Sequence, residues 1–363
     1  MEFCGLDHEV LSRWCQEQGW GSYVADQLFD WVYQKKVFDF ALMSNVKKEY
    51  RTALAATFSL PRISLERSLT TEEATKCLWR LPDGYFVESV LLFSPGRKTL
   101  CVSSQVGCPA RCAFCASGKQ GGVRNLSRGE ILEQVLLTEE LLHQKGERLS
   151  HIVFMGMGEP LENFSALQFA LKQLQSPKVF GISQRKITVS TVGIVDQIYA
   201  LADSGSRVPL VLSLHAPSQE IRKKIIPYAR KYDLDEILAA MDYYAKTTKR
   251  DITYEYILIE GLNAAPEHAA MLAKLLQEKR LTQSTVNLIP YNPVPGLRLK
   301  RPSQKAILAF ERTLQKLGIR FTRRYTKGTE IAAACGQLAL HPASGASEKS
   351  SVTPLKVSAA GCA

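Results

Sequence analysis

The stretch Thr99-Leu-Cys-Val-Ser-Ser-Gln-Val-Gly-Cys108-Pro-Ala-Arg-Cys112-Ala-Phe-Cys115 joins a predicted strand to a loop with three cysteines. The spacing C-x3-C-x2-C lets the backbone turn around one inorganic centre. A [4Fe–4S] cluster usually takes four thiolates, one per iron, so three thiolates leave one iron open to a small chelating ligand. The stretch therefore predicts an iron–sulfur cluster held by Cys108, Cys112 and Cys115.

Two other interpretations of this loop are open. Zinc normally takes four ligands in a tetrahedron, but the loop contains no histidine, and His143 and His151 lie well downstream. Three unrelated buried cysteines are the other alternative, because free cysteine is often buried. The match to iron–sulfur spacing favours the cluster.

The composition indicates a soluble protein with a sizeable core. The 363 residues are 45% hydrophobic, an ordinary share, and no run of 18 apolar residues predicts a membrane span. The start of the chain lacks the basic and apolar regions of a signal peptide. We therefore expect a cytoplasmic protein, in which nine cysteines, an odd number, favour cluster or redox chemistry over a disulfide framework. The sequence assigns no role to Cys4, Cys15, Cys77 and Cys362.

The net charge of +11 suggests a polyanionic partner, most simply a nucleic acid. Residues 1–60 contain six Lys/Arg and eight Asp/Glu, so the positive excess lies in the rest of the chain. Each basic cluster alone is more simply explained as part of a solvent-exposed face. Together, the clusters predict an RNA or DNA partner. The clusters are Arg222-Lys223-Lys224, Arg230-Lys231, Lys249-Arg250, Arg298 with Lys300-Arg301, and Arg323-Arg324.

The hydrophobic pattern divides the chain into four parts. Residues 6–58 have helical periodicity, with Val24, Leu28 and Trp31 on one face. Asp83-Gly84 lies between two alternating runs and predicts a β-hairpin. We therefore expect a helical domain at 1–60, a β-hairpin extension at 61–97, a region of strands and helices at 98–339 and a disordered Ala/Ser-rich tail at 340–363.

From residue 99 predicted strands and helices alternate. The first helix begins at Ser127-Arg-Gly-Glu130, a capping-box signature. Repeated β–α units imply a parallel sheet, open or closed into a barrel, and sites in such sheets gather at the carboxyl ends of the strands. The predicted strands are 99–104, 151–155, 186–190, 209–214, 253–259, 285–289 and 320–323.

Further motifs follow these strands. The glycines of Met155-Gly-Met-Gly-Glu-Pro160 allow the backbone to approach a ligand, and the carboxylate of Glu159 can accept from an ammonium group. Each of these residues alone is more simply explained as a turn or cap residue, but all of them lie at one end of the predicted barrel. The others are Ser190, Ser213, Leu214, His215 and Asn292.

Together the motifs resemble one family. The stretch 99–108, Phe154-Met-Gly-Met-Gly-Glu-Pro160, Ser213-Leu-His-Ala-Pro217 and Ala334-Cys-Gly-Gln-Leu338 are similar to the RlmN/Cfr family of radical S-adenosylmethionine (SAM) methyltransferases. The resemblance covers about residues 6–339 and implies an α/β fold with a partial (β/α)6 radical SAM barrel. It implies a [4Fe–4S] cluster on Cys108, Cys112 and Cys115. It also implies that SAM is bound by Gly158, Glu159, Ser190, Ser213, Leu214, His215 and Asn292.

The resemblance implies a reaction with two SAM molecules, because carbon 2 of adenine is no nucleophile. One SAM methylates Cys335, and the 5′-deoxyadenosyl radical from a second takes a hydrogen from that methyl group. The methylene radical adds to adenine, and Glu88 matches the family's proton acceptor. Cys101 then attacks the Cys335 sulfur, which releases the product and leaves a transient disulfide.

By the same resemblance the substrates are large-subunit (23S) rRNA and the tRNA position next to the anticodon. We expect RNA contact by residues 1–60, a flavodoxin-like reductant and a monomer. Thr329-Glu330 and Val294 depart from the usual family pattern. The alternatives are a Cfr-type adenine-C8 methyltransferase, a non-catalytic RNA-binding protein with a structural cluster or zinc, and a radical SAM enzyme for another substrate.

Overall fold

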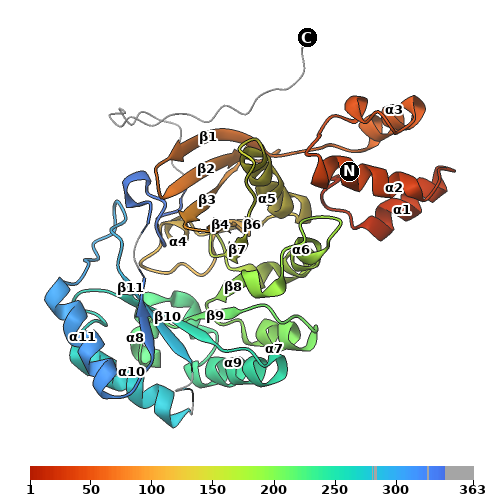
Figure 1. Ribbon diagram of the computed structural model, residues 1–363. Coiled ribbons are helices and arrows are strands. Elements are labelled where there is room, and N and C mark those ends of the chain that lie inside the picture. Colours follow the sequence, from red (N-terminus) through yellow and green to blue (C-terminus); the bar gives the residue numbers. More distant parts are fainter. Residues whose placement is uncertain (280, 282–283, 325–326, 340–363) are drawn as a thin grey trace.

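The computed structural model of the protein describes residues 1–279, 281, 284–324 and 327–339 (Figure 1). The predicted tail at 340–363, with Cys362, lies outside these residues. None of the described helices is both long and apolar enough to cross a lipid bilayer.

One mixed sheet of ten strands organises the fold, in the order β1-β2-β3-β4-β7-β8-β9-β10-β11-β12. Its second part is parallel, as the β–α alternation predicts. Within the described residues β12 does not pair with β1, so the sheet is open and forms a partial (β/α)6 barrel followed by one more strand. The parallel strands are β4 (Arg97–Cys101), β7 (His151–Phe154), β8 (Ile187–Thr191), β9 (Leu210–Ser213), β10 (Thr253–Leu258), β11 (Thr285–Pro290) and β12 (Phe321–Arg323).

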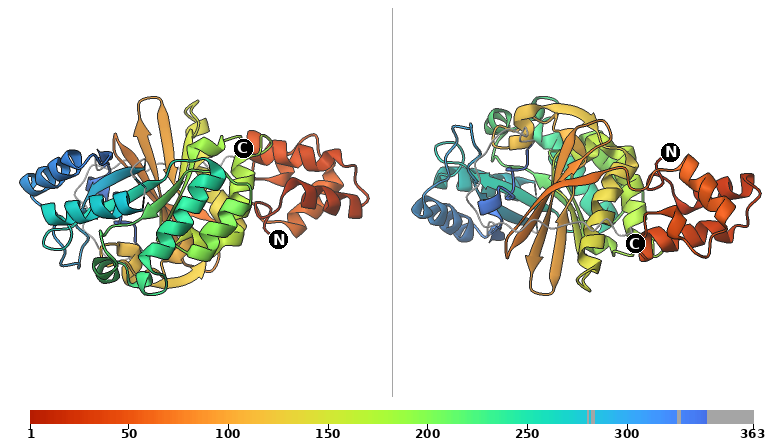
Figure 2. Two further views of the ribbon diagram at one scale, coloured as in Figure 1. Left: turned by 90° about the horizontal axis from the view of Figure 1, so that it is seen from below. Right: turned by 90° about the horizontal axis from the view of Figure 1, so that it is seen from above.

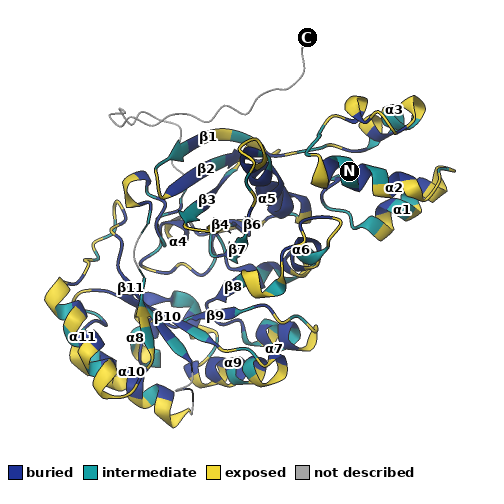
Figure 3. Ribbon diagram, in the orientation of Figure 1, coloured by how far each residue is buried: buried dark blue, intermediate teal, exposed yellow. Residues whose placement is uncertain are grey.

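Helices connect the parallel strands and surround the curved sheet (Figures 1 and 2). Their apolar faces and the central strands are buried together (Figure 3). The longest helix starts at the predicted capping box, where Ser127 and Glu130 bond to each other's backbone amides. The helices are α5 (Arg128–His143), α6 (Phe164–Gln175), α7 (Val195–Asp203), α8 (Gln219–Ile225), α9 (Leu234–Thr248), α10 (Pro266–Glu278) and α11 (Gln304–Lys316).

The antiparallel strands before β4 continue the same sheet. They are β1 (Ser64–Thr70), β2 (Ala74–Arg80) and β3 (Phe86–Ser94). The predicted hairpin is β2–β3, in which Leu78 lies opposite Glu88. Because β3 also pairs with β4, with Val90 opposite Cys101, the hairpin is joined directly to the barrel strands. Glu88 is therefore placed on the same sheet as Cys101.

A small second sheet frames the cysteine loop and was not predicted from the sequence. Here β5 (Gln105–Gly107) pairs with β6 (Gly122–Asn125), and α4 (Ala116–Gln120) lies between them. Gly107 has φ 73°, and a Cβ added there would lie 1.9 Å from the carbonyl oxygen of Gly121. Only glycine allows this close approach of two backbones, which closes the loop at its base.

The amino-terminal helices form a unit beside the barrel (Figure 2). An aromatic core that includes Phe3, Phe29 and Phe58 packs inside this unit. Towards the barrel, Lys178 pairs with Asp26 at 2.6 Å. The helices are α1 (His8–Glu17), α2 (Tyr23–Phe29) and α3 (Lys48–Thr57), with a π turn at η1 (Asp30–Gln34) and a 3-10 turn at η2 (Phe40–Leu42).

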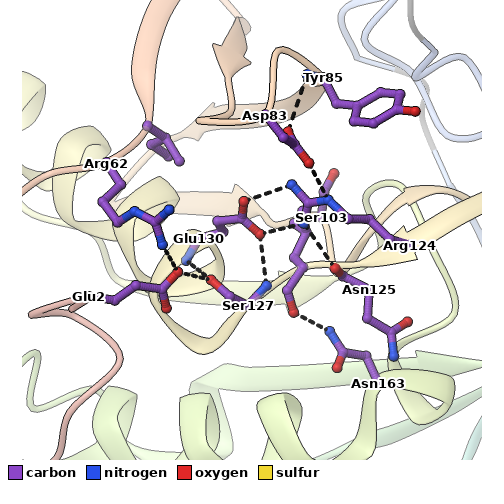
Figure 4. A network of polar contacts seen from close by, with 12 residues as sticks. Glu2, Arg62, Asp83, Tyr85, Ser103, Arg124, Asn125, Ser127, Glu130 and Asn163 are labelled. Carbon is purple, nitrogen blue, oxygen red and sulfur yellow. Dashed lines mark hydrogen bonds and ion pairs between the residues drawn. The ribbon is translucent and has the colours of Figure 1, made fainter.

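A polar network ties the first residues of the chain to the start of α5 (Figure 4). The carboxylate of Glu2 accepts hydrogen bonds from Arg62 and from the hydroxyl of Ser127. On the other side of the capping box, Arg124 makes two hydrogen bonds to Glu130 at 2.8 and 2.9 Å. The network therefore fixes where the chain enters α5, next to the sheet that frames the cysteine loop.

Candidate active site

The three cysteines of the loop lie together beyond the carboxyl end of β4. Cys108 and Cys112 are 9% exposed, and Cys115 is half-buried. Burial, together with a smaller effect of the neighbouring Cys115, raises the pKa of Cys108 to about 12. A buried thiol such as that of Cys108 ionises when a cationic centre takes the place of its proton.

The cysteines do not converge on one point. Among the described residues no group of three or more His, Cys, Asp or Glu side chains stands close enough to hold a single metal ion. A tetrahedral zinc site needs such convergence, whereas an iron–sulfur cluster takes each thiolate on a separate iron. Three thiols with the buried Arg222 nearby are a donor set that fits such a cluster.

Arg222 supplies positive charge beside this loop, and this position corrects the prediction from the sequence. The sequence predicts Arg222 within a surface basic cluster, but its side chain is 0% exposed. Its Nη2 donates to the carbonyl oxygens of Val192 and Ser213 at 2.5 and 3.2 Å, and its Nη1 is buried without a partner among the described residues. Both Cys112 and Glu159 raise its pKa against the effect of burial, so they lie near it. A buried cation with a spare donor fits a group that carries negative charge, as a thiolate-ligated cluster does.

Glu159 is buried between two loops. Its carboxylate accepts from the backbone amides of Leu161 at 3.0 Å and Val192 at 2.8 Å. Burial raises its pKa to about 7. The preceding Gly158 has φ 107°, and a Cβ there would lie 2.7 Å from atoms of Ser104 and Gln105. This glycine is therefore already required by packing against β5, a reason that the sequence interpretation did not include.

The carboxyl ends of β8 and β9 lie side by side, and His215, just after β9, contacts the cysteine loop. The hydroxyls of Ser190 and Ser213 lie 3.3 Å apart on neighbouring strands. His215 follows Leu214, and its ring packs edge-on against Phe114 of the loop at 4.8 Å. Its Nδ1 accepts from the amide of Ile257 at 3.0 Å, and burial lowers its pKa to about 3, so the imidazole is neutral.

The carboxyl-terminal segment, residues 327–339, crosses over the cysteine loop. The carbonyl oxygen of Gly336 accepts from Ala116 N at 2.8 Å, and that of Leu338 accepts from the hydroxyl of Ser117 at 2.5 Å. Asn292, beyond β11, donates to the carbonyl oxygen of Cys335 at 3.2 Å. These bonds hold Cys335 above the ends of the strands.

Cys101 and Cys335 line one cavity together with Cys115. Its volume is about 60 Å³, and all three thiols are free. Burial and, to a smaller extent, the neighbouring Cys335 raise the pKa of Cys101 to about 12. Burial also raises the pKa of Cys335, whereas the charge of Arg324 lowers it. The fold thus brings two thiols from distant parts of the sequence to the cysteine loop.

Glu88 is buried near this segment and has partners of its own. It pairs with the buried Lys76 at 3.0 Å and accepts from the amide of Ala339 at 2.8 Å. Glu88 is not among the described residues that line the cavities beside Cys335. In this arrangement the carboxylate of Glu88 is engaged by Lys76 and by the amide of Ala339.

Comparisons with known proteins agree with this geometry. The model of the radical SAM superfamily matches residues 102–273, and that of the "Ribosomal RNA large subunit methyltransferase N-terminal domain" matches residues 1–60. A protein of Protochlamydia amoebophila (strain UWE25), named "Probable dual-specificity RNA methyltransferase RlmN 2", is 54% identical over 347 residues, which are 95% of this chain and 96% of that protein. The chain belongs to the RlmN family.

Two further proteins are similar over more than nine tenths of this chain. A "Probable dual-specificity RNA methyltransferase RlmN" of Thermotoga neapolitana is 45% identical and covers 92% of this chain and 96% of its own length. The crystal structure of a radical SAM methyltransferase from Sphaerobacter thermophilus superposes with a TM-score of 0.89 and 39% identity over 93% of this chain and 99% of that one. The radical SAM fold inferred from the motifs is therefore confirmed.

A second arginine of the site, Arg324, was also missed in the sequence analysis of this RlmN-family chain. Arg324 lines both cavities beside Cys335 and pairs with Glu255 at 3.1 Å. In the sequence it is one half of a basic dipeptide at a strand end, which gives no sign that it lines these cavities. The only signal for Arg222 is its position one turn before the buried Ile225, on the apolar face of α8.

Proposed function

We propose that this RlmN-family chain is a radical SAM methyltransferase that methylates carbon 2 of adenosine, in 23S rRNA and in tRNA next to the anticodon. The observation that carries the proposal is the shared cavity of Cys101, Cys115 and Cys335. A structural cluster needs no further thiols beside it. A route through a methylated cysteine needs two, one to carry the methyl group and one to release it.

Cys108, Cys112 and Cys115 hold the cluster, and Arg222 balances its charge. When bound, the cluster supplies the electron that cleaves SAM. The proposed SAM-binding residues surround the same end of the sheet: Gly158, Glu159, Ser190, Ser213, Leu214, His215 and Asn292. The buried Glu159 accepts from an ammonium group more readily than from water, because in the low-dielectric interior an opposite charge offsets the cost of its ionisation.

The chain's own thiols perform the transfer. Cys335 accepts a methyl group on its sulfur, and the charge of Arg324 favours the thiolate that this step requires. After the methylene carbon is bonded to adenine, Glu88 takes the ring proton. The adduct would also lose its one unpaired electron, which the oxidised cluster, when bound, would take up. The thiolate of Cys101 then attacks the Cys335 sulfur, so that a sulfur–sulfur bond forms, the carbon–sulfur bond to the product breaks, and the released methylene carbon takes a proton to become the methyl group.

The proposal also covers RNA contact, location in the cell, oligomeric state and the source of electrons. The helical unit at 1–60 contacts RNA, although its own charge is slightly negative, and the rest of the chain provides most phosphate contacts. The protein works as a cytoplasmic monomer and receives electrons from a flavodoxin-like reductant.

The test is a peptide mass spectrum of Cys335 from protein purified without oxygen and incubated with SAM and reductant. One methyl group on Cys335 is expected, followed by 2-methyladenosine in nucleosides of treated RNA. A Cfr-type activity would give 8-methyladenosine instead. Absence of both the methyl group and 5′-deoxyadenosine would show a non-catalytic protein.

A further inference from the structure

A cavity of about 360 Å³ inside the curved sheet has two chemically different ends. At its buried end lie Asn292, Ala334 and the half-buried Cys335. At its exposed end lie Arg97 and Lys186, which are both exposed. The cavity therefore opens to solvent beside two cations and ends at the proposed methyl carrier.

The open end lies at the amino ends of the parallel strands. Arg97 is the first residue of β4, His151 is the first of β7, and Lys186 directly precedes β8. Side chains on a strand alternate, so Arg97, Thr99 and Cys101 share one face, over about 13 Å of β4. Arg97 and Thr99 line the large cavity and Cys101 the small one beside Cys335, so this face leads from the mouth to the two thiols.

The charges at this mouth lack a counter-charge within the part of the chain that the structure describes. There, the neighbouring Lys98 pairs with Glu147 at 2.9 Å, but no carboxylate forms an ion pair with Arg97 or Lys186. Burial lowers the pKa of His151, and so do the charges of Arg97 and Lys186. These three groups therefore lie close together. Lys327, also at the cavity, donates to Ser94 Oγ at 2.9 Å. Gathered like charges repel one another, and a polyanion relieves this repulsion.

The opposite end of the barrel is covered. The carboxyl-terminal segment bonds to Ala116, Ser117 and Glu88, and the cysteine loop bonds from Ala113 N to the carbonyl oxygen of Ile225 at 2.8 Å. A base that entered from this end would have to break these contacts. A base that entered at the mouth would meet only the walls of the cavity, such as Thr99, Val153 and Thr188.

We propose that the target adenosine, turned out of its stack, enters the barrel through the amino-terminal mouth formed by Arg97, His151 and Lys186. Arg97 and Lys186 bind backbone phosphates on either side of it, and the base reaches Cys335 through the cavity. This inference rests on the proposed function and adds to it the route and the residues of RNA entry.

The test compares two variants with equal charge changes. Arg97→Gln/Lys186→Gln removes two cations at the mouth. Lys305→Gln/Arg312→Gln removes two exposed cations of α11 that lie outside the basic clusters named above. RNA binding is measured as a function of salt concentration, and RNA methylation as KM and kcat. Removal of one phosphate-binding cation reduces the slope of log K against log salt by roughly 0.7 to 0.9.

We expect the slope for the mouth variant to fall by about one to two and its KM to rise at least tenfold, while the control stays near wild type. A mouth variant whose salt slope and KM equal those of the control would overturn the proposed route. Methylation of Cys335 needs no RNA and is followed in the same preparations. If wild-type Cys335 is never methylated, the proposed function has failed instead, which separates the two conclusions.

Discussion

Cys335 lies where the carboxyl-terminal segment crosses the cysteine loop, and we predict that Cys335→Ala abolishes methyl transfer to RNA. The other two thiols of the shared cavity cannot replace it, because Cys115 is proposed to hold the cluster and Cys101 to release the product. The measurement is transfer of labelled methyl from SAM to RNA, with 5′-deoxyadenosine formation recorded in parallel. Cys15→Ala, which removes a buried thiol from the helical unit, is the matched control and should retain transfer. Transfer by Cys335→Ala would rule out the methyl-cysteine route.

Cys101 shares that cavity, and we predict that Cys101→Ala traps the protein on its RNA. Without the attacking thiolate, the carbon–sulfur bond between Cys335 and the base persists. Denaturing gels should show a slow band that ribonuclease removes and that dithiothreitol, which reduces disulfides, does not. A Cys101→Ala enzyme with normal repeated turnover would refute the release step.

Strands β2 and β3 hold the carboxyl-terminal segment through one buried ion pair. Lys76 also donates to the carbonyl oxygen of Ala332 at 3.4 Å, while Glu88 accepts from Ala339, so the pair holds both sides of Cys335. Lys76→Met leaves the Glu88 charge buried and unpaired, and we expect a loss of about 3–5 kcal/mol in the free energy of unfolding. Urea unfolding measures this loss, and hydrogen exchange at residues 332–339 should become faster.

The double variant Lys76→Met/Glu88→Gln provides the control for this pair. Replacing both charges removes the uncompensated one, so most of the lost stability should return. If Lys76→Met alone changes stability by less than about 1 kcal/mol, a range typical of exposed pairs, then the pair does not hold the segment in solution.

The helical unit and the barrel meet at Glu133, which makes their joint sensitive to pH. This buried residue of α5 accepts from the amides of Arg62 and Ile63 at 2.8 and 2.9 Å. Burial raises its pKa from 4.5 to about 7. Between these values the folded protein binds more protons than the unfolded chain, so the free energy of unfolding falls as pH rises. The contribution of protonated Glu133 to the free energy of unfolding is fully present below pH 4.5. It is lost as the pH rises through 7, and the loss is about 3 kcal/mol at most.

Glu133→Gln isolates this effect, because the amide retains an oxygen acceptor and does not titrate. Glu159 has a similarly raised pKa in both proteins, so the difference between their stability curves belongs to Glu133 alone. We expect the variant to be more stable than wild type at pH 8 and the difference to shrink towards pH 5. Parallel curves from urea unfolding at pH 5 to 8 would show that Glu133 does not titrate in this range.

Local patterns in the sequence predicted the elements and the cysteine chemistry. The capping box at Ser127 and Glu130, the hairpin turn at Asp83 and the alternation of strands and helices depend on neighbouring residues, and the structure confirms each of them. The spacing of Cys108, Cys112 and Cys115 is local too. Each feature could be predicted because the interactions that produce it lie within a few residues of one another.

Tertiary structure alone decided the burial of Arg222, the partners of Glu88 and the two ends of the large cavity. Each depends on which distant segment packs against a given side chain. Arg222 belongs to a basic run in the sequence, but α8 turns it towards Cys112; Arg97, His151 and Lys186 are far apart along the chain and meet only because parallel strands start at one edge. Charge and spacing in the sequence determine what chemistry is available, whereas the packing of the sheet determines which charges stay in water and which face the thiols.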